Sequence, residues 1–253
     1  MSRQARKKSS TGIYHIMVRG INNENIFLED EDKEKYIDLL RKMKEVTAIN
    51  IYGYCIMDSH LHLLVKEGEE YIGDTMKRIG VSYVYWYNKK YKRKGHLFQD
   101  RYKSQVVEND IYLISLLRYI HQNPIKAKIV DKIEDYRWSS YNVYISKDKD
   151  NIVNKKKIIT YFEGKSEKES IKEFKKFMID KGTKFDYEEE KVIKITDEQL
   201  KSKIEEILQG NSLKDQSLDN RNKILREIKK NEDASIRQIA RVTEISRNII
   251  AKA

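Results

Sequence analysis

Residues 49–66 constrain the fold of this chain more than any other stretch. The segment INIYGYCIM (49–57) is rich in β-branched and aromatic residues, and HLHLLVK (60–66) has the same character. Between them, Asp58 and Ser59 suit a tight turn. The stretch therefore predicts a β-hairpin, and the elements on either side decide which kind of sheet the hairpin joins.

The elements around the hairpin give the order β-α-β-β-α-β. The predicted elements are a strand at 13–19, a helix at 31–47, the hairpin, a helix at 70–92, a strand near 103–107, and a helix from Asn109 or Asp110 to about residue 122. This order predicts an α+β protein with a ferredoxin-like antiparallel sheet covered by helices.

The composition changes after about residue 145, which predicts that the chain contains more than one domain. SKDKDNIVNKKK is highly charged and is typical of a linker, whereas 166–181 opens with the helix-capping pattern Ser166-x-x-Glu169. From 196 onward several short helices are predicted, with capping patterns at Thr196-x-x-Gln199 and Ser235-x-x-Gln238. The predicted parts are a basic arm at 1–11, the α+β domain at 12–145, a charged connector containing a helix at 146–195, and a helical domain at 196–253.

Composition excludes several classes of protein. The chain has a net charge of +11, which favours a polyanionic partner such as nucleic acid. Its single cysteine, Cys55, excludes a disulfide framework within one chain and fits a reducing compartment. No apolar run approaches the roughly 20 residues of a membrane span, and the basic start MSRQARKKSS has no apolar stretch behind it. We therefore expect a cytoplasmic protein, with neither a membrane partner nor a signal peptide.

His60 and His62 lie two positions apart on the second strand of the predicted hairpin. Residues i and i+2 of a strand point to the same face, whereas Leu61 and Leu63 point to the other. Two imidazoles placed in this way are able to bind one metal ion. The alternative from the residues alone is a pair of histidines on a solvated strand face.

Tyr119 and Asn123 form a second candidate pair on the helix that begins near Asp110. They are one helical turn apart, and Tyr119 lies on the flank of the apolar stripe. Pro124, the only proline, disfavours helical geometry at Asn123, so the helix is predicted to end there. An ordinary boundary tyrosine is the alternative interpretation.

Three motifs in order change the interpretation of these residues. HLHLLV in the hairpin, then GHLFQDRYKS (95–104), then RYIHQNP (118–124), resemble the single-tyrosine HUH transposases, and most of all the REP-associated tyrosine transposases. The first strand and loop, YHIMVRGINNENIF (14–27), resemble that family too. The resemblance covers about residues 12–145.

The resemblance implies an enzyme that cleaves and rejoins DNA strands. It implies that His60, His62 and Asn123 hold a divalent metal, Mg²⁺ or Mn²⁺, and that Tyr119 is the nucleophile. The expected activity is that of a metal-dependent single-strand DNA endonuclease and strand transferase acting through a 5′-phosphotyrosine on hairpin-containing DNA, associated with the bacterial nucleoid. The alternative is a non-catalytic regulator that binds DNA or RNA hairpins. The sequence leaves both a monomer and a homodimer open.

The region 89–103 is the main predicted DNA contact. It carries seven Lys or Arg residues against one Asp, interleaved with the aromatic rings of Tyr91, Phe98 and Tyr102, on which unpaired bases are expected to stack. The DNA-contact candidates in the α+β domain are His15, Arg19, Lys89, Lys90, Lys92, Arg93, Lys94, His96, Arg101 and Lys103.

The C-terminal stretch ASIRQIARVTEISRNIIAKA (234–253) predicts a helix-turn-helix. Ala240 occupies the small position where the two helices cross, and Glu244 stands where the turn usually has glycine. Ile239, Ile245 and Ile250 are predicted core residues, and Arg247 and Asn248 are predicted DNA contacts on the recognition helix. The region 196–253 resembles, less closely, the DNA-binding domain of the replication initiator DnaA. The alternative is a packing or dimerising helical cap.

Overall fold

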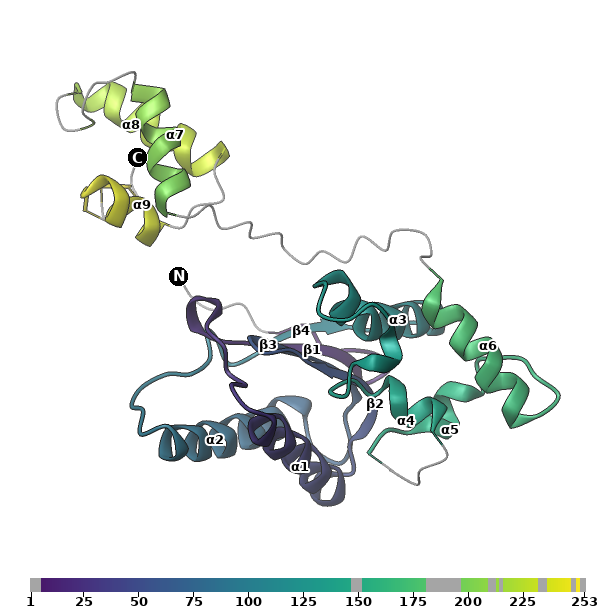
Figure 1. Cartoon of the computed structure of the whole chain (residues 1–253). Coiled ribbons are helices and arrows are strands. Elements are labelled where there is room, and N and C mark those ends of the chain that lie inside the picture. Colours follow the sequence, from purple (N-terminus) through teal and green to yellow (C-terminus); the bar gives the residue numbers. More distant parts are fainter. Residues whose placement is uncertain are drawn as a thin grey trace. The chain divides into compact units, whose positions relative to one another are not determined.

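A computed structural model describes residues 6–146, 152–180, 197–208, 213, 216–231, 236–246 and 249–250 of the chain. The chain divides into two compact units, Met1–Phe185 and Asp186–Ala253. The first unit contains the sheet and the second is helical (Figure 1). Within the described residues, no helix is long and apolar enough to cross a membrane.

The first unit is built on a four-stranded antiparallel sheet with the order β2-β3-β1-β4. Its strands are β1 (Ile13–Arg19), β2 (Asn50–Ile56), β3 (His60–Lys66) and β4 (Lys103–Val106). Helix α1 (Asp30–Thr47) joins β1 to β2, and α2 (Ile72–Lys90) joins β3 to β4. The ferredoxin-like prediction is confirmed because the element order and the central placement of β1 and β3 both match it.

Helices cover both faces of this sheet (Figure 1). Helices α1 and α2 lie on one face, and α3 (Asp110–Lys126) lies on the other. On the α3 side, a Cβ added to Gly53 of β2 would lie only 2.3 Å from Cδ1 of Leu117. The missing side chain at Gly53 therefore lets α3 approach the sheet closely, and that approach sets the position of every residue that α3 presents to the sheet.

Helix α3 begins as predicted but does not end where predicted. The side chain of Asn109 caps it by accepting a hydrogen bond from the backbone N–H of Tyr112, at 2.8 Å. The prediction that the helix ends at Asn123 is wrong, because α3 continues through Pro124 to Lys126. A proline cannot donate to the carbonyl four residues earlier, which here belongs to Ile120. Nδ2 of Asn123 donates instead, to the carbonyl oxygens of Tyr119 at 2.9 Å and Ile120 at 3.4 Å.

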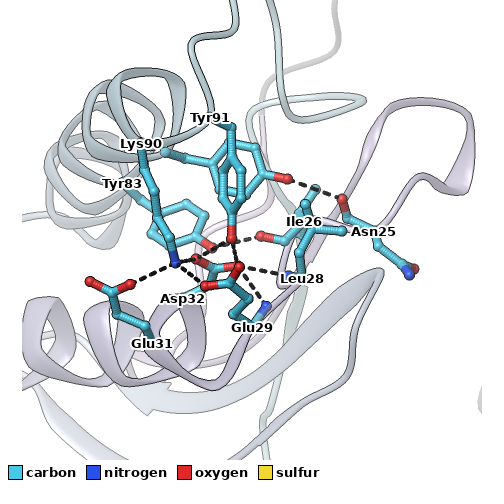
Figure 2. Close-up of polar contacts among 10 residues, drawn as sticks. Asn25, Ile26, Leu28, Glu29, Glu31, Asp32, Tyr83, Lys90 and Tyr91 are labelled. Atoms are coloured by element: carbon cyan, nitrogen blue, oxygen red, sulfur yellow. Dashed lines mark hydrogen bonds and ion pairs between the residues drawn. The ribbon is translucent and has the colours of Figure 1, made fainter.

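A buried carboxylate ties the start of α1 to the end of α2 (Figure 2). Asp32 is fully buried and accepts hydrogen bonds from Nζ of Lys90 at 2.8 Å and from the hydroxyl of Tyr91. Lys90 also pairs with Glu29 at 2.9 Å and with Glu31 at 2.8 Å. These bonds satisfy a charge that would be costly to bury alone.

Residues 152–180 belong to the first unit, so the predicted connector at 146–195 is in part a packed element. The helix predicted at 166–181 is α6 (Glu167–Ile179), and Ser166 caps it by accepting from the N–H of Glu169. Phe174 of α6 packs against His121 of α3, with ring centroids 6.3 Å apart. The short elements between the sheet and α6 are η2 (Ile133–Asp135), α4 (Tyr141–Ile145) and α5 (Lys155–Ile159), and η1 (Ile21–Asn23) follows β1.

The second unit contains α7 (Asp197–Leu208), α8 (Leu218–Asn231) and α9 (Ile236–Thr243). Ile239, Ile245 and Ile250 are buried in its apolar core, which confirms their predicted role. Thr196 and Ser235, the predicted caps, lie outside the described residues. Glu244 follows α9 with a φ of 56°, the left-handed conformation that favours glycine. This left-handed residue lies at the position where the sequence predicts the turn of a helix-turn-helix.

Candidate active site on the sheet

The candidate site lies on the sheet face that α3 covers. In the antiparallel register Met17 faces His62 and Arg19 faces His60, so their side chains share one face. His15, two residues before Met17 on β1, points to the same face. The register thus gathers three histidines and an arginine from two central strands.

His62 is fully buried, and its Nδ1 lies 3.0 Å from Nε2 of His15. Burial lowers the pKa of His15 to about 3 and holds the pKa of His62 well below its ordinary value, so both rings are neutral at pH 7. His60 is half-buried, and its Nδ1 lies 3.1 Å from the hydroxyl oxygen of Ser59. Nδ1 of each HUH histidine is therefore engaged in a hydrogen bond, and neutral imidazole is the form that binds metals.

Tyr119 of α3 lies directly against these histidines. Its ring centroid is 5.7 Å from that of His62 and 6.5 Å from that of His15, both edge-on. Although the sequence places Tyr119 on the flank of the apolar stripe, it is only 8% exposed because this flank faces the histidines on the sheet. Nζ of Lys126, two turns further along α3, lies 4.3 Å from the centre of the Tyr119 ring.

Asn123 is also buried, one turn beyond Tyr119. Since its Nδ2 donates to the backbone carbonyls of Tyr119 and Ile120, its carbonyl oxygen is the atom that a cation would use. The residue therefore has a structural task in the helix next to its predicted role as a ligand. One side chain that serves both tasks would couple the position of Tyr119 to that of a bound metal.

The side chains at this site fit a divalent metal in part. Nε2 of His62 is buried and has no hydrogen-bond partner among the described residues, which is the state of a nitrogen that ligates a cation. Over the same residues, no cluster of three or more His, Cys, Asp and Glu side chains is arranged to hold a metal. Two imidazoles and an amide oxygen would leave the remaining positions to phosphate oxygens, a donor set suited to Mg²⁺ or Mn²⁺.

The predicted DNA contacts fall into groups that the sequence does not distinguish. His15 is only 1% exposed and belongs to the histidine cluster, whereas its role as a DNA contact stays a prediction. Lys90 is held by three carboxylates at the start of α1, and Arg93 lies 3.7 Å from Glu24. Arg19 is half-buried on the site face. The exposed candidates are Lys89, Lys92, Lys94, His96, Arg101 and Lys103.

Each of the three aromatic rings of this segment contacts another part of the protein. The hydroxyl of Tyr91 donates to Asp32, and Phe98 stacks on Tyr83 with centroids 6.2 Å apart. Tyr102 is 6% exposed, and the guanidinium of Arg6 lies 3.8 Å from its ring centre. The expected stacking of bases on these rings stays a prediction.

Of the neighbours of Tyr119, sequence reasoning missed Lys126 and named His15 only as a DNA contact. His15 is recognisable as a site residue only through the pairing of β1 and β3. Lys126 follows Tyr119 by seven residues, a spacing that returns to the same helix face and is the one sequence signal for it. Arg247 and Asn248, the predicted contacts of the second unit, lie outside the described residues.

Three comparisons with known proteins concern the same part of the chain. Residues 8–123 match the family model described as transposase IS200 like. A protein of Haemophilus influenzae, provisionally named as a REP-associated tyrosine transposase, is 24% identical over 164 residues, which span 56% of this chain and 86% of that protein. The solved structure of a REP-associated tyrosine transposase bound to a REP hairpin has the same fold, with a TM-score of 0.50 and 18% identity over 58% of this chain and 87% of that one. Over residues 8–123, this chain is therefore similar to the IS200-like transposases.

Proposed function

We propose that this protein is a metal-dependent single-strand DNA endonuclease and strand transferase that acts on hairpin-containing DNA. The observation that carries the proposal is the packing of Tyr119 against His62, 5.7 Å between ring centroids, beside a buried Nε2 without a hydrogen-bond partner among the described residues. A candidate nucleophile and two candidate metal ligands thus lie together on one face of the sheet. The segment that carries them is the one that matches the transposase family model.

The chemistry is a transesterification. The hydroxyl oxygen of Tyr119 forms a bond to the scissile phosphorus, and the bond from phosphorus to the 3′ oxygen breaks. The products are a 5′-phosphotyrosine and a free 3′ hydroxyl, and the proton lost by tyrosine balances the one gained by the 3′ oxygen. The ester keeps the energy of the broken bond, so a later 3′ hydroxyl is able to reverse the step on another strand.

Each neighbouring residue has a task in this scheme. His60, His62 and the carbonyl oxygen of Asn123 would hold the Mg²⁺ or Mn²⁺, which when bound withdraws charge from the phosphate and orients it for in-line attack. Lys126, exposed and beside the Tyr119 ring, places a positive charge where the phosphate of the covalent product would lie. The side chain of Asn123 donates to the carbonyl oxygens of Tyr119 and Ile120 and so stabilises α3 around Pro124. The intact helix holds Tyr119 in position over the sheet.

The experiment that tests this function is incubation of the purified protein with single-stranded hairpin oligonucleotides and Mn²⁺. We expect a protein–DNA adduct that survives denaturing electrophoresis and that EDTA prevents. Tight hairpin binding without any adduct or cleaved strand would instead identify a non-catalytic regulator that keeps the transposase fold.

The exposed basic residues after α2 are expected to bind phosphates. Replacing Lys92 and Lys94 with alanine should lower the slope of log affinity for hairpin DNA against log salt by about 0.7–0.9 for each phosphate that the variant no longer neutralises. The matched control replaces Lys42 of α1 and Lys77 of α2 with alanine. Both lysines are also exposed, so the control variant loses the same charge. An equal fall of the slope in both double variants would show a general effect of net charge and no binding surface at 92–94.

We propose in addition that the second unit binds duplex DNA as a helix-turn-helix. This proposal is supported by the left-handed turn at Glu244 and by the burial of Ile239, Ile245 and Ile250 around it. Arg247→Ala in the full chain should weaken duplex binding about tenfold and leave hairpin cleavage unchanged. Unchanged duplex affinity in fluorescence anisotropy would favour a packing or dimerising role.

A further inference from the structure

The contact between His15 and His62 is a hydrogen bond between two ring nitrogens. Nε2 of His15 lies 3.0 Å from Nδ1 of His62, and the rings stack with centroids 5.1 Å apart and planes inclined by 11°. Both rings are buried, with exposures of 1% and 0%. The two residues come from adjacent central strands, which pair over seven residues, so the backbone holds the contact in place.

Such a bond admits only two arrangements of protons. Either Nδ1–H of His62 donates to Nε2 of His15, or Nε2–H of His15 donates to Nδ1 of His62. In the second arrangement a neutral His62 carries its proton on Nε2. That N–H would then be a buried donor with no acceptor among the described residues, because Nε2 of His62 has no hydrogen-bond partner there. In the first arrangement the same Nε2 presents a lone pair.

We propose that His15 is a positioning residue that accepts the proton of Nδ1 of His62 and so fixes His62 in the tautomer whose Nε2 binds the metal. The proposal rests on the proposed function, in which His62 is a metal ligand. Ligating histidines commonly have their second nitrogen tied to a partner that sets the ring orientation. At the neighbouring ligand the hydroxyl of Ser59 meets Nδ1 of His60, so both rings are held through the same nitrogen.

The first test measures the tautomer directly and needs neither metal nor DNA. In ¹⁵N NMR spectra of the metal-free protein, His62 should carry its proton on Nδ1 in the wild type. His15→Phe keeps a flat ring in the stack but removes the acceptor, so the proton of His62 should no longer be confined to Nδ1. His15→Gln restores an acceptor oxygen and should return it to Nδ1. A wild-type His62 protonated on Nε2 overturns the proposal, even if His15→Phe does not fold.

The second test measures Mn²⁺ affinity by titration calorimetry. His15→Phe should weaken binding by about 10- to 100-fold, and His15→Gln should recover most of the loss. His121→Phe is the control, because His121 is also fully buried and bonded through Nε2, to Ser140 at 2.9 Å, but lies among Tyr141, Tyr144 and Phe174. Its substitution should leave both the His62 tautomer and the Mn²⁺ affinity unchanged. Wild-type affinity in His15→Phe would overturn the positioning role.

The two tests separate this inference from the proposed function. If Mn²⁺ binds the wild type and His62→Ala equally, His62 is not a ligand and the proposed metal site fails. The proposal for His15 then fails as well, but the NMR spectra still show whether His15 sets the tautomer of His62. If Mn²⁺ binding depends on His62 but not on His15, the proposed function stands and only the role of His15 is refuted.

Discussion

Tyr119→Phe is expected to form no covalent adduct with hairpin DNA and to cleave it more than about a thousandfold more slowly than the wild type. The substitution removes only the hydroxyl and keeps the ring that packs edge-on against His62, so folding and hairpin binding should persist. Adduct formation is measured by denaturing electrophoresis with labelled DNA, and mass spectrometry of the digested adduct identifies the modified residue.

Tyr112→Phe is the matched control for this prediction. Tyr112 lies two turns earlier on the same helix and is half-buried, so its replacement makes the same chemical change in a similar setting. It should retain most of the adduct formation. An adduct on Tyr112, or on any residue other than Tyr119, would show that the nucleophile is misassigned. Normal cleavage by Tyr119→Phe would exclude the covalent mechanism and favour attack by a metal-activated water.

The sheet and the helices that flank it were predictable because each has its own local pattern. The strand segments are β-branched and aromatic, and β1 and β3 match their predicted ranges of 13–19 and 60–66. The end of α3 was not predictable from Pro124 alone, because the side chain of Asn123 reaches the carbonyl that proline leaves without its donor. The rule that a proline ends a helix fails there because the Asn123 side chain replaces the missing backbone donor.

The candidate site was predictable for the residues that carry a motif and not for those that the register brings in. His60, His62, Tyr119 and Asn123 stand at fixed spacings in the sequence, whereas His15 is 47 residues away from His62. Lys90 counts as one more charge of a basic segment until α1 places Asp32 against it from 58 residues away. Contacts between residues distant in sequence decide whether a charged or aromatic side chain faces solvent or the core. The local sequence pattern does not reveal those contacts.

His60→Ala and His62→Ala are each expected to reduce Mn²⁺-dependent cleavage by about a thousandfold, with little loss of hairpin affinity. The reason is that a bound metal contributes several kcal/mol to the stabilisation of charge on the phosphate, and a rate falls tenfold for each 1.4 kcal/mol lost. DNA affinity should persist because the exposed cations at 92–103 are untouched. Removal of metal from the wild type with EDTA should give the same loss, and adding EDTA to either variant should change nothing further.

His121→Ala separates the loss of a ligand from the loss of a buried histidine. His121 is as buried as His62, but its Nε2 is bonded to Ser140, away from the HUH pair. All three variants should first be shown by circular dichroism to be folded, since removal of a fully buried imidazole, as in His62→Ala and His121→Ala, leaves a cavity that lowers stability. His121→Ala should then keep cleavage that responds to Mn²⁺ and EDTA. If His60→Ala and His62→Ala cleave as fast as His121→Ala, the two histidines hold no metal that matters to the reaction, and their shared strand face requires another explanation.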